Sequence, residues 1–382
     1  MRPVLDIIYN MTSVCPHDCN GCCVDAAHVA RRGENVYIRT KGLTADECVL
    51  RRDRSVSIYD VAARRFQESG RELKFEQKLA VVKHLDVEGV RLDVSGGDPL
   101  CVTENIDVLR AASAKLGRDN VTLTATGAGV AQVDLSEIVN LVSEFNFTFD
   151  SATPGDVTDR PATYASRNLV LGKQLAELGA TTRAEFPITR PTSSPDHVER
   201  LYLQLHDAKI SKLLLMRLFA VGRGAQLVGS ILSPAEYRTV IAQLRGLEAR
   251  WGTPTVKLQC ALRHLERWNT GAPANYENPC DLARESFGLT PKGVLLASPW
   301  AINGHGEPLD EIFVLGNLAE TPLSEILMSP RVREMRIRAD ENLGICKIFA
   351  FQHSALVSPM DRLFDKTDPL YVAHHPASVA AE

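Results

Sequence analysis

The residues with the clearest chemical potential are cysteines near the amino terminus. Four of the nine cysteines in this 382-residue chain lie close together, at Cys15, Cys19, Cys22 and Cys23. The first three have the spacing Cys-x3-Cys-x2-Cys, and a short loop with thiolates at this spacing can bind three irons of a four-iron cube. The fourth iron of such a cube is then open to a ligand.

A structural zinc site is the main alternative for these cysteines. Zinc in structural sites takes four protein ligands, so the three spaced cysteines would need a fourth from Cys23, His17 or His28. A disulfide is less favoured, because the chain shows no secretory signal and cysteines in a reducing compartment more often bind metals or perform redox chemistry. The spacing alone leaves both an iron–sulfur cluster and a zinc site open.

A second segment of interest is Ser95-Gly96-Gly97-Asp98-Pro99, which follows an apolar run at 90–94. Two adjacent glycines let a backbone approach a bound ligand closely. The carboxylate beside them can accept hydrogen bonds from an ammonium group. A Gly-Gly pair alone usually marks a turn, so its meaning depends on the motif that accompanies it.

Together, the two motifs resemble those of the radical S-adenosylmethionine superfamily. The resemblance implies that Cys15, Cys19 and Cys22 hold a [4Fe–4S] cluster whose open iron binds the amino and carboxylate groups of S-adenosylmethionine. It also implies that the segment 95–99 binds the cofactor's amino group. The chain departs from the family at Cys23, where an aromatic residue is common, and at Asp98, where glutamate is usual.

The composition is that of an ordinary globular protein. The formal net charge is -4 and apolar residues make up 45% of the chain. This balance disfavours a dedicated nucleic-acid binder, and no apolar run is long enough to span a membrane. Met1-Arg2-Pro3 leads into a strand-like segment instead of a signal peptide. We therefore expect a cytoplasmic protein with neither a membrane nor nucleic acid as partner.

Strand and helix patterns alternate along the first two thirds of the chain. The expected strands cover 4–9, 90–94, 121–127, 145–151, 182–188 and 212–219. The expected helices cover 75–89, 105–115, 138–144, 169–178, 197–208 and 233–251. This alternation predicts an α/β fold with a parallel, barrel-like sheet, and it matches the partial (β/α)6 TIM-like barrel that the resemblance implies.

The expected barrel defines four regions. The core covers 1–228 and includes a polar, arginine-rich insertion at 29–72, which we expect to be partly helical. The insertion is either a solvated cover or a lid over an anionic substrate. A helical bridge follows at 229–272, then a smaller α+β region at 273–350 and a flexible tail at 351–382.

Ligands of parallel barrels bind at the carboxyl ends of the strands, and several polar residues are expected there. They are Thr126, Asp150, Ser151, Arg183 and Arg217. The resemblance implies contacts of Asp150 and Ser151 with the cofactor's ribose or carboxylate, although a carboxylate at this position also caps turns. Either arginine could pair with the methionyl carboxylate through its planar fork, the alternative being an ordinary surface ion pair.

The last third resembles a SPASM/Twitch module, which in the family carries auxiliary iron–sulfur clusters. The resemblance rests on the arginine–glycine segment 216–224 and on the pattern Cys280-x12-Gly293-x4-Ser298. Ser298 stands where the family has cysteine, and only Cys346 stands where it has later Cys-x2-Cys groups. We expect a degenerate module without an auxiliary cluster, the alternative being a three-thiolate site at Cys260, Cys280 and Cys346.

The resemblance implies a radical enzyme that abstracts hydrogen from a small natural product or a peptide. The required electron would come from an external donor of the flavodoxin or ferredoxin type. If no auxiliary cluster accepts an electron, a thiol that returns hydrogen to the substrate is favoured, along with redox-neutral rearrangement, elimination or coupling. Cys23, Cys48 and Cys101 are candidate donors, each with the alternative of a buried structural thiol.

Two questions stay open at this stage. The chain leaves no room before the first strand for a peptide-recognition domain, so we favour a small metabolite or a peptide presented by a partner. A non-catalytic iron–sulfur or zinc protein with a structural or sensing role is the alternative to an enzyme.

Overall fold

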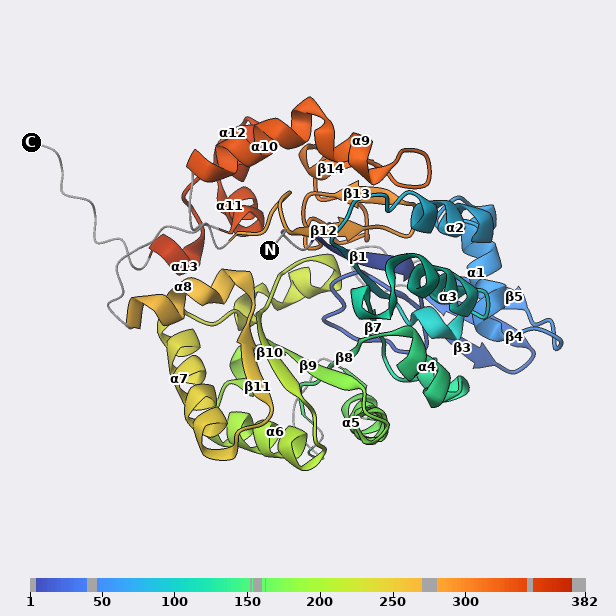
Figure 1. Cartoon of the computed structure of the whole chain (residues 1–382), viewed down its shortest axis with the longest axis horizontal. Coiled ribbons are helices and arrows are strands. Elements are labelled where there is room, and N and C mark those ends of the chain that lie inside the picture. The colour runs from blue at the N-terminus through green and yellow to red at the C-terminus, as the bar shows by residue number, and fades with distance from the viewer. Residues whose placement is uncertain are drawn as a thin grey trace, which may run out of the picture.

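The computed structural model describes residues 5–39, 47–151, 153, 160–161, 163–269, 280–341 and 346–372. A ten-stranded sheet with the order β11-β10-β9-β8-β7-β6-β1-β12-β13-β14 forms its centre (Figure 1). The strands from β11 to β1 are mutually parallel and comprise β1 (Leu5–Thr12), β6 (Val90–Gly96), β7 (Val121–Thr124), β8 (Glu144–Thr148), β9 (Thr181–Ile188), β10 (Lys212–Arg217) and β11 (Thr255–Leu258).

Helices link the parallel strands and cover the outer face of the sheet (Figure 1). They are α2 (Phe75–Lys83), α3 (Asn105–Leu116), α4 (Leu135–Leu141), α5 (Tyr164–Glu177), α6 (Pro195–Asp207), α7 (Pro234–Trp251) and α8 (Cys260–Asn269). In β6, Leu92 and Val94 are fully buried in the main apolar core. Their neighbours Arg91 and Asp93 point to the inner face, where they line a cavity.

The α/β fold and the parallel barrel-like sheet predicted from the sequence are confirmed. All six predicted strands are present, and the boundaries differ by a few residues: β8 ends at Thr148 and β10 at Arg217. The helix expected at 138–144 is α4 at 135–141, because the side chain of Asp134 accepts a hydrogen bond from Ser136 N and starts the helix earlier. The segment predicted as a helical bridge also contains a seventh parallel strand, β11.

The insertion is mainly a small sheet. β3 (Ala27–Arg32), β4 (Asn35–Arg39) and β5 (Glu47–Arg51) pair antiparallel, and β3 also pairs with β2 (Val14–Cys15). Helix α1 (Ile58–Glu68) packs on this sheet through a separate apolar core that includes Val29, Val36 and Phe66. In the described part of the insertion, the expected helix is α1, and the small sheet begins with β2, whose second residue is Cys15.

The carboxyl-terminal region continues the main sheet. β12 (Ser286–Leu289) pairs parallel with β1, and β13 (Val294–Leu296) and β14 (Val314–Asn317) follow antiparallel. The predicted turn between β12 and β13 contains Gly293 at φ 79°. Two helices, α9 (Leu323–Met328) and α10 (Pro330–Glu341), lie beyond the strands at the top of Figure 1.

The tail expected to be flexible is helical in much of its described part, which ends at residue 372. Its elements are α11 (Lys347–His353), α12 (Pro359–Leu363) and α13 (Pro369–Val372). Leu363 and Leu370 are buried in the main core, so apolar burial holds the segment in place. The His374-His375 pair lies outside the described residues.

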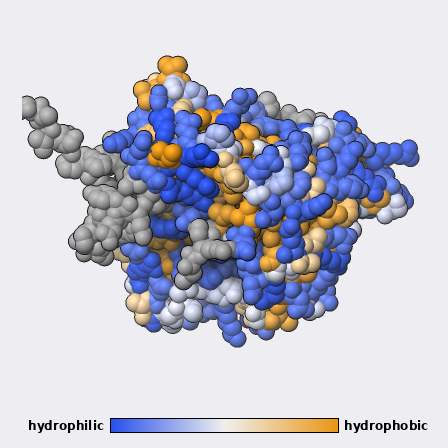
Figure 2. Space-filling view, turned by 45° about the horizontal axis from the view of Figure 1, so that its top comes forward, coloured by the Kyte–Doolittle hydropathy of each residue, from blue (hydrophilic) through white to orange (hydrophobic). Residues whose placement is uncertain are grey.

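The exterior carries few large apolar side chains. Hydrophilic residues predominate on the face in Figure 2, with apolar ones scattered among them. Within the described part of the chain, every helix is too short or too polar to cross a membrane.

Candidate functional site

The segment that follows β10 contacts the cysteine loop and holds its backbone through Arg223. Arg223 is 1% exposed, and it donates from Nε to the carbonyl of Cys19 at 3.0 Å and from Nη1 to the carbonyl of Ala26 at 2.8 Å. Its backbone N–H also donates to Cys22 O at 2.9 Å. Gly222 has φ 54°, and a Cβ there would lie 2.3 Å from Cys23 O. The chain after β10 therefore fixes the path of the loop between its cysteines.

A buried charge network holds the start of the same loop. Glu72 accepts hydrogen bonds from Thr12 Oγ1 at 2.8 Å and from Ser13 N at 3.2 Å. Lys78 Nζ lies 2.9 Å from the other carboxylate oxygen of Glu72 and 2.9 Å from Asn105 Oδ1. Burial raises the pKa of Glu72, and the ammonium of Lys78 and these donors oppose that shift. The network fixes the two residues that precede the cysteine motif.

The two glycines of the second motif pack directly against the cysteine loop. A Cβ on Gly96 would lie 2.4 Å from Thr12 O, and one on Gly97 would lie 2.1 Å from Val14 O. Gly97 N donates to Thr12 O and Asp98 N donates to Val14 O, both at 2.8 Å. Any larger residue at either position would push the two segments apart. The motifs recognised separately in the sequence are therefore joined backbone to backbone.

The Asp98 carboxylate lies behind this junction, away from the cavity. It is fully buried and accepts hydrogen bonds from Thr126 Oγ1 at 2.5 Å and from Gly129 N at 2.9 Å. Burial raises its pKa, and these donors oppose the shift. The side chain ties the end of β6 to the loop after β7. The carboxylate is fully enclosed in this structure, and contact of the segment 95–99 with a cofactor's amino group stays a prediction.

A cavity of about 680 Å³ opens where the two motifs meet. Of the predicted site residues, those that line it are Cys15, Cys19, Cys22, Cys23, Ser95, Gly96, Gly97, Thr126, Arg183 and Cys260. Asp98, Pro99, Asp150, Ser151 and Arg217 are not among its lining residues. The cavity therefore joins the cysteine loop, the strand ends and the inner face of the barrel.

Arg160 is a cavity residue that no sequence signal indicated. Its Nε lies 2.8 Å from Asp150 Oδ2, and its guanidinium carbon lies 5.3 Å from the centre of the Tyr164 ring. Burial lowers the pKa of Arg160, but the charge of Asp150 and the neighbouring cysteines outweigh that effect and raise it. A permanent cation therefore stands beside Cys19 and Cys23. Asp150 acts here as its partner, and Ser151 accepts a hydrogen bond from Thr153 N at 2.9 Å.

Arg217 forms a buried ion pair with Asp368. Its two terminal nitrogens lie 2.9 and 2.8 Å from the two carboxylate oxygens of Asp368. Both side chains are 0% exposed, and the Arg217 guanidinium carbon lies 3.2 Å from the centre of the Phe349 ring. This buried pair fits the ion-pair alternative for Arg217, and its pairing with a methionyl carboxylate stays an untested prediction. The planar fork is already filled by a residue from the tail.

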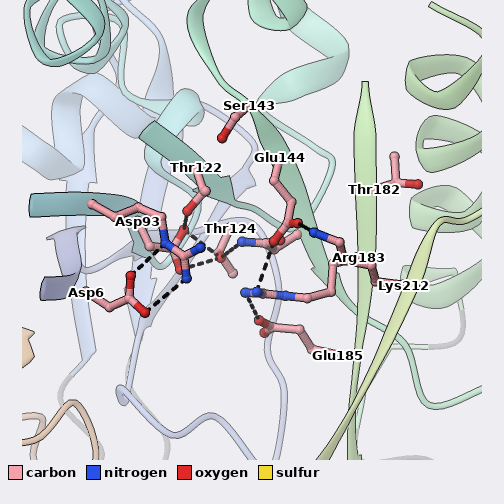
Figure 3. Close-up of polar contacts among 12 residues, drawn as sticks. Asp6, Asp93, Thr122, Thr124, Ser143, Glu144, Thr182, Arg183, Glu185 and Lys212 are labelled. Atoms are coloured by element: carbon pink, nitrogen blue, oxygen red, sulfur yellow. Dashed lines mark hydrogen bonds and ion pairs between the residues drawn. The ribbon is translucent and has the colours of Figure 1, made fainter. Parts of the chain in front are cut away.

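The inner end of the cavity carries paired charges. Arg91 binds Asp6 through two contacts of 2.6 and 3.0 Å. Arg183 lies between Glu144, at 2.9 Å, and Glu185, at 3.1 Å (Figure 3). Arg183 thus faces the cavity near the start of β9 and not at the carboxyl end of the strand where it was expected, and two carboxylates occupy its terminal nitrogens. In most closed parallel barrels this space is filled by branched apolar side chains.

Asp93 differs from the other carboxylates of this layer in the groups that bind it. Thr122 Oγ1 donates to it at 3.0 Å, and Thr124 Oγ1 lies 2.9 and 2.8 Å from its two oxygens. Burial, and after it the charge of Glu185, raise the pKa of Asp93 to about 6 against the opposing effects of Arg183 and the threonine hydroxyls. It is a carboxylate solvated by neutral hydroxyl groups inside a cavity.

The three candidate hydrogen-donor thiols lie in different places. Cys23 lines the cavity, and burial raises the pKa of its thiol to about 12. Cys101 is buried beside Asp98, behind the glycine segment, and Cys48 packs against the small core under α1. Only Cys23 of the three lines the cavity. Cys48 and Cys101 fit the alternative of structural thiols.

The cysteines of the possible second site do share one neighbourhood. Burial raises the pKa of Cys260, and the charges of Asp281, Cys280 and Cys346 raise it further. Burial likewise raises the pKa of Cys346 to about 12. Ser298 is buried and accepts a hydrogen bond from Trp300 N at 3.3 Å. The thiols of Cys260, Cys280 and Cys346 therefore lie near one another. An iron–sulfur cluster usually takes four protein ligands, one more than these three.

The donor set at the amino-terminal cysteines suits an iron–sulfur cluster. Burial raises the pKa of the Cys15 and Cys19 thiols, so cationic partners such as iron are needed to keep them as thiolates. Among the described residues, no three His, Cys, Asp or Glu side chains converge on a point where one metal ion would sit.

Solved structures of other proteins have a fold similar to that of this chain. No family model and no curated protein sequence matches the chain. Among solved structures, it is similar to SuiB from Streptococcus suis bound to precursor peptide SuiA, with a TM-score of 0.66 and 12% identity over 97% of this chain and 76% of that one. The partial-barrel fold expected from the radical S-adenosylmethionine resemblance is thereby confirmed.

Two further solved structures contain a bound cofactor. SuiB bound to S-adenosylmethionine matches with a TM-score of 0.63 and 13% identity over 94% of this chain and 75% of that one. The protein anSMEcpe with bound AdoMet and a Cp18Cys peptide matches with a TM-score of 0.54 and 13% identity over 95% of this chain and 96% of that one.

Proposed function

We propose that this chain is a radical S-adenosylmethionine enzyme. The observation that carries the proposal is the backbone junction of Gly96 and Gly97 with Thr12–Val14, which brings the Cys-x3-Cys-x2-Cys loop and the glycine segment to one mouth of a large cavity. A [4Fe–4S] cluster on Cys15, Cys19 and Cys22 with S-adenosylmethionine bound would supply a 5′-deoxyadenosyl radical able to abstract hydrogen from a substrate.

The protein's own part is to orient the reactants and exclude water. Cys15 and Cys19 are 5% and 7% exposed, and Arg223 closes the loop behind them. Ser95 and Thr126 line the cavity beside the glycines and are the side chains best placed to contact a cofactor there. Arg160 adds a positive charge next to Cys19, which favours the thiolate form.

The cavity also supports a role for Cys23 as a hydrogen donor to a substrate radical. Its thiol is protonated at neutral pH because burial raises its pKa to about 12. Transfer of hydrogen from sulfur to a carbon radical would leave a sulfur radical, which an external one-electron donor of the flavodoxin or ferredoxin type would reduce, with uptake of a proton. The substrate is either a small natural product or a peptide, and SuiB and anSMEcpe have been solved with peptides bound.

The test is anaerobic reconstitution of the purified chain followed by dithionite and S-adenosylmethionine. We expect 5′-deoxyadenosine by mass spectrometry from the wild type and none from Cys19→Ala, with Cys48→Ala as a control that keeps the activity. Iron analysis should give about four irons per chain, unchanged by Cys280→Ser. Zinc without iron or sulfide would instead support the structural alternative, and a nucleoside yield equal in Cys19→Ala and wild type would refute the proposal.

A further inference from the structure

The cavity continues past the cysteine loop to the inner end of the barrel. Asp93 lies three residues before Gly96 on β6, which places it about 10 Å deeper along the strand. Asp93, Arg183 and Glu185 line the same cavity as the cluster cysteines. A molecule that reaches from the strand ends to this level would contact both.

The charges at the inner end do not balance. The group around Asp93 has four carboxylates and three cationic side chains, which leave one negative charge when all are ionised; they are Asp6, Asp93, Glu144, Glu185, Arg91, Arg183 and Lys212. Apart from Arg160, which is paired with Asp150, six further charged residues line the same cavity with equal numbers of each sign and do not change this balance; they are Arg245, Lys257, Arg263, Glu248, Glu266 and Asp281. The cations are already bound to Asp6, Glu144 and Glu185 at distances of 2.5 to 3.1 Å. Asp93 instead accepts hydrogen bonds from the hydroxyl groups of Thr122 and Thr124. The excess charge therefore belongs to Asp93.

Two buried polar atoms at this level also make no hydrogen bond within the described part of the chain. They are Oδ1 of Asn146 and Nε of Arg183, from residues that are paired in the β8–β9 register. Asn146 Nδ2 donates at 3.2 Å to Thr124 Oγ1, the hydroxyl that contacts Asp93. Arg183 lines the cavity, so its open donor is a group that a polar ligand with an acceptor would satisfy.

We infer that the inner end of this cavity is a binding site for a protonated primary amine that also carries hydrogen-bonding groups, with Asp93 as the carboxylate that receives the ammonium. An ammonium group offers three donors and one positive charge, which matches the unneutralised carboxylate of Asp93 on the cavity wall. A carboxylate or phosphate ligand fits less well, because both terminal ends of Arg183 are occupied and a second anion would face Asp93 and Glu185. The inference rests on the proposed function, since it names the substrate class for that cavity.

Two pairs of probes separate amine recognition from general affinity. Glucosamine is compared with glucose, and N-acetyl-lysinamide with N-acetyl-norleucinamide, by calorimetric titration of the full chain at pH 7. We expect the amine of at least one pair to bind about tenfold or more tightly than its neutral partner, which corresponds to about 1.4 kcal/mol. A preference in the sugar pair would indicate a free amino compound, and a preference in the lysine pair would indicate a lysine side chain of a peptide.

The variant Asp93→Asn should abolish the preference, and Asp119→Asn, a change at an 88% exposed side chain on the outer surface, should leave it intact. Thr124→Val provides a second variant that keeps the carboxylate but removes one of its hydroxyl donors, and it should change the preference only partly. The inference is overturned if both pairs bind equally, if no amine binds, or if the preference persists in Asp93→Asn.

The binding should also depend on pH. Figure 3 shows Asp6 of β1, Glu144 of β8, Arg183 and Glu185 of β9 and Lys212 of β10 around Asp93. Arg91, on the same strand as Asp93, is paired with Asp6. Because the pKa of Asp93 is about 6, the preference for the amine should fall as the pH drops through 6, and a preference that is constant from pH 7 to 5 would contradict the role of Asp93. The titration requires neither cluster nor S-adenosylmethionine, so its failure is distinct from a failure of the 5′-deoxyadenosine test.

Discussion

Lys78 Nζ lies 2.9 Å from Oε1 of Glu72, and both side chains are 0% exposed. The pair connects helix α2 to Glu72, which lies three residues before the first residue of that helix. The other carboxylate oxygen of Glu72, Oε2, accepts a hydrogen bond from Thr12, just before the cysteine loop. Lys78 also contacts Asn105, whose Nδ2 donates to Pro99 O at 2.9 Å. One buried ammonium thus links the segments before the cysteine motif and after the glycine motif.

The first prediction concerns this ammonium. Lys78→Met should lower the free energy of unfolding by about 3–5 kcal/mol, because it leaves a buried carboxylate without its cation. Lys83→Met, on the exposed side of the same helix, is the matched control and should change stability by less than about 0.5 kcal/mol. Urea unfolding of both variants measures the difference. Equal stability of the two variants would show that the network contributes no more than a surface lysine.

The second prediction concerns the backbone junction. Gly97→Ala would place a methyl group 2.1 Å from Val14 O, so the cysteine loop must shift. We expect this variant to bind much less iron than wild type after reconstitution, as judged by iron analysis and the visible absorption of the cluster. Gly246→Ala is the control, because that glycine lies in helix α7 and a methyl group there would meet no atom within 4 Å outside its own helix backbone. It should bind iron normally and gain about 0.5–1 kcal/mol in stability.

Much of this arrangement follows from local sequence. The alternation of apolar strands and helices sets the order of the parallel sheet, and the two motifs fall at strand ends, where such barrels bind ligands. The cysteine spacing and the adjacent glycines were recognisable because their chemistry depends on residues close together in the chain. Gly96 and Gly97 illustrate a limit, since their tight contact with Thr12 and Val14 could not be inferred from the pair alone.

What could not be predicted depends on partners far apart in the sequence. Arg217 and Asp368 are 151 residues apart, and neither residue signals the other locally. The enclosure of the Asp98 carboxylate could not be predicted because its two donors, Thr126 and Gly129, come from a loop beyond the next strand. The strands of the insertion were missed because their many arginines hid the alternating Val29, Val36 and Ile38 pattern that packs under α1.

The third prediction concerns the buried pair of Arg217 and Asp368. Asp368→Asn should destabilise the chain by about 3–5 kcal/mol, because it leaves a buried guanidinium without its counter-charge. The double variant Arg217→Met/Asp368→Asn should lose less than the sum of the losses in Arg217→Met and Asp368→Asn, since no unpaired charge is left in it. Denaturant unfolding gives the double-mutant cycle. Additive losses would mean that the two side chains do not interact in solution.

The last prediction concerns the pH dependence of stability through Asp93. Its pKa in the folded chain is raised from an ordinary value near 3.8 to about 6, mainly by burial. Between these values the folded state binds more protons than the unfolded state, so the contribution of Asp93 to stability decreases as the pH rises and is constant above about pH 6. In Asp93→Asn, which has no carboxyl group to titrate at this position, this decrease in stability with rising pH should be absent. Denaturant unfolding of both chains measures this effect. As the pH rises from 4 to 7, the free energy of unfolding of the wild type should fall by about 1–3 kcal/mol relative to that of Asp93→Asn. A difference that stays constant with pH, or that moves in favour of the wild type as the pH rises, would mean that the carboxylate is ionised in the folded chain over the whole range.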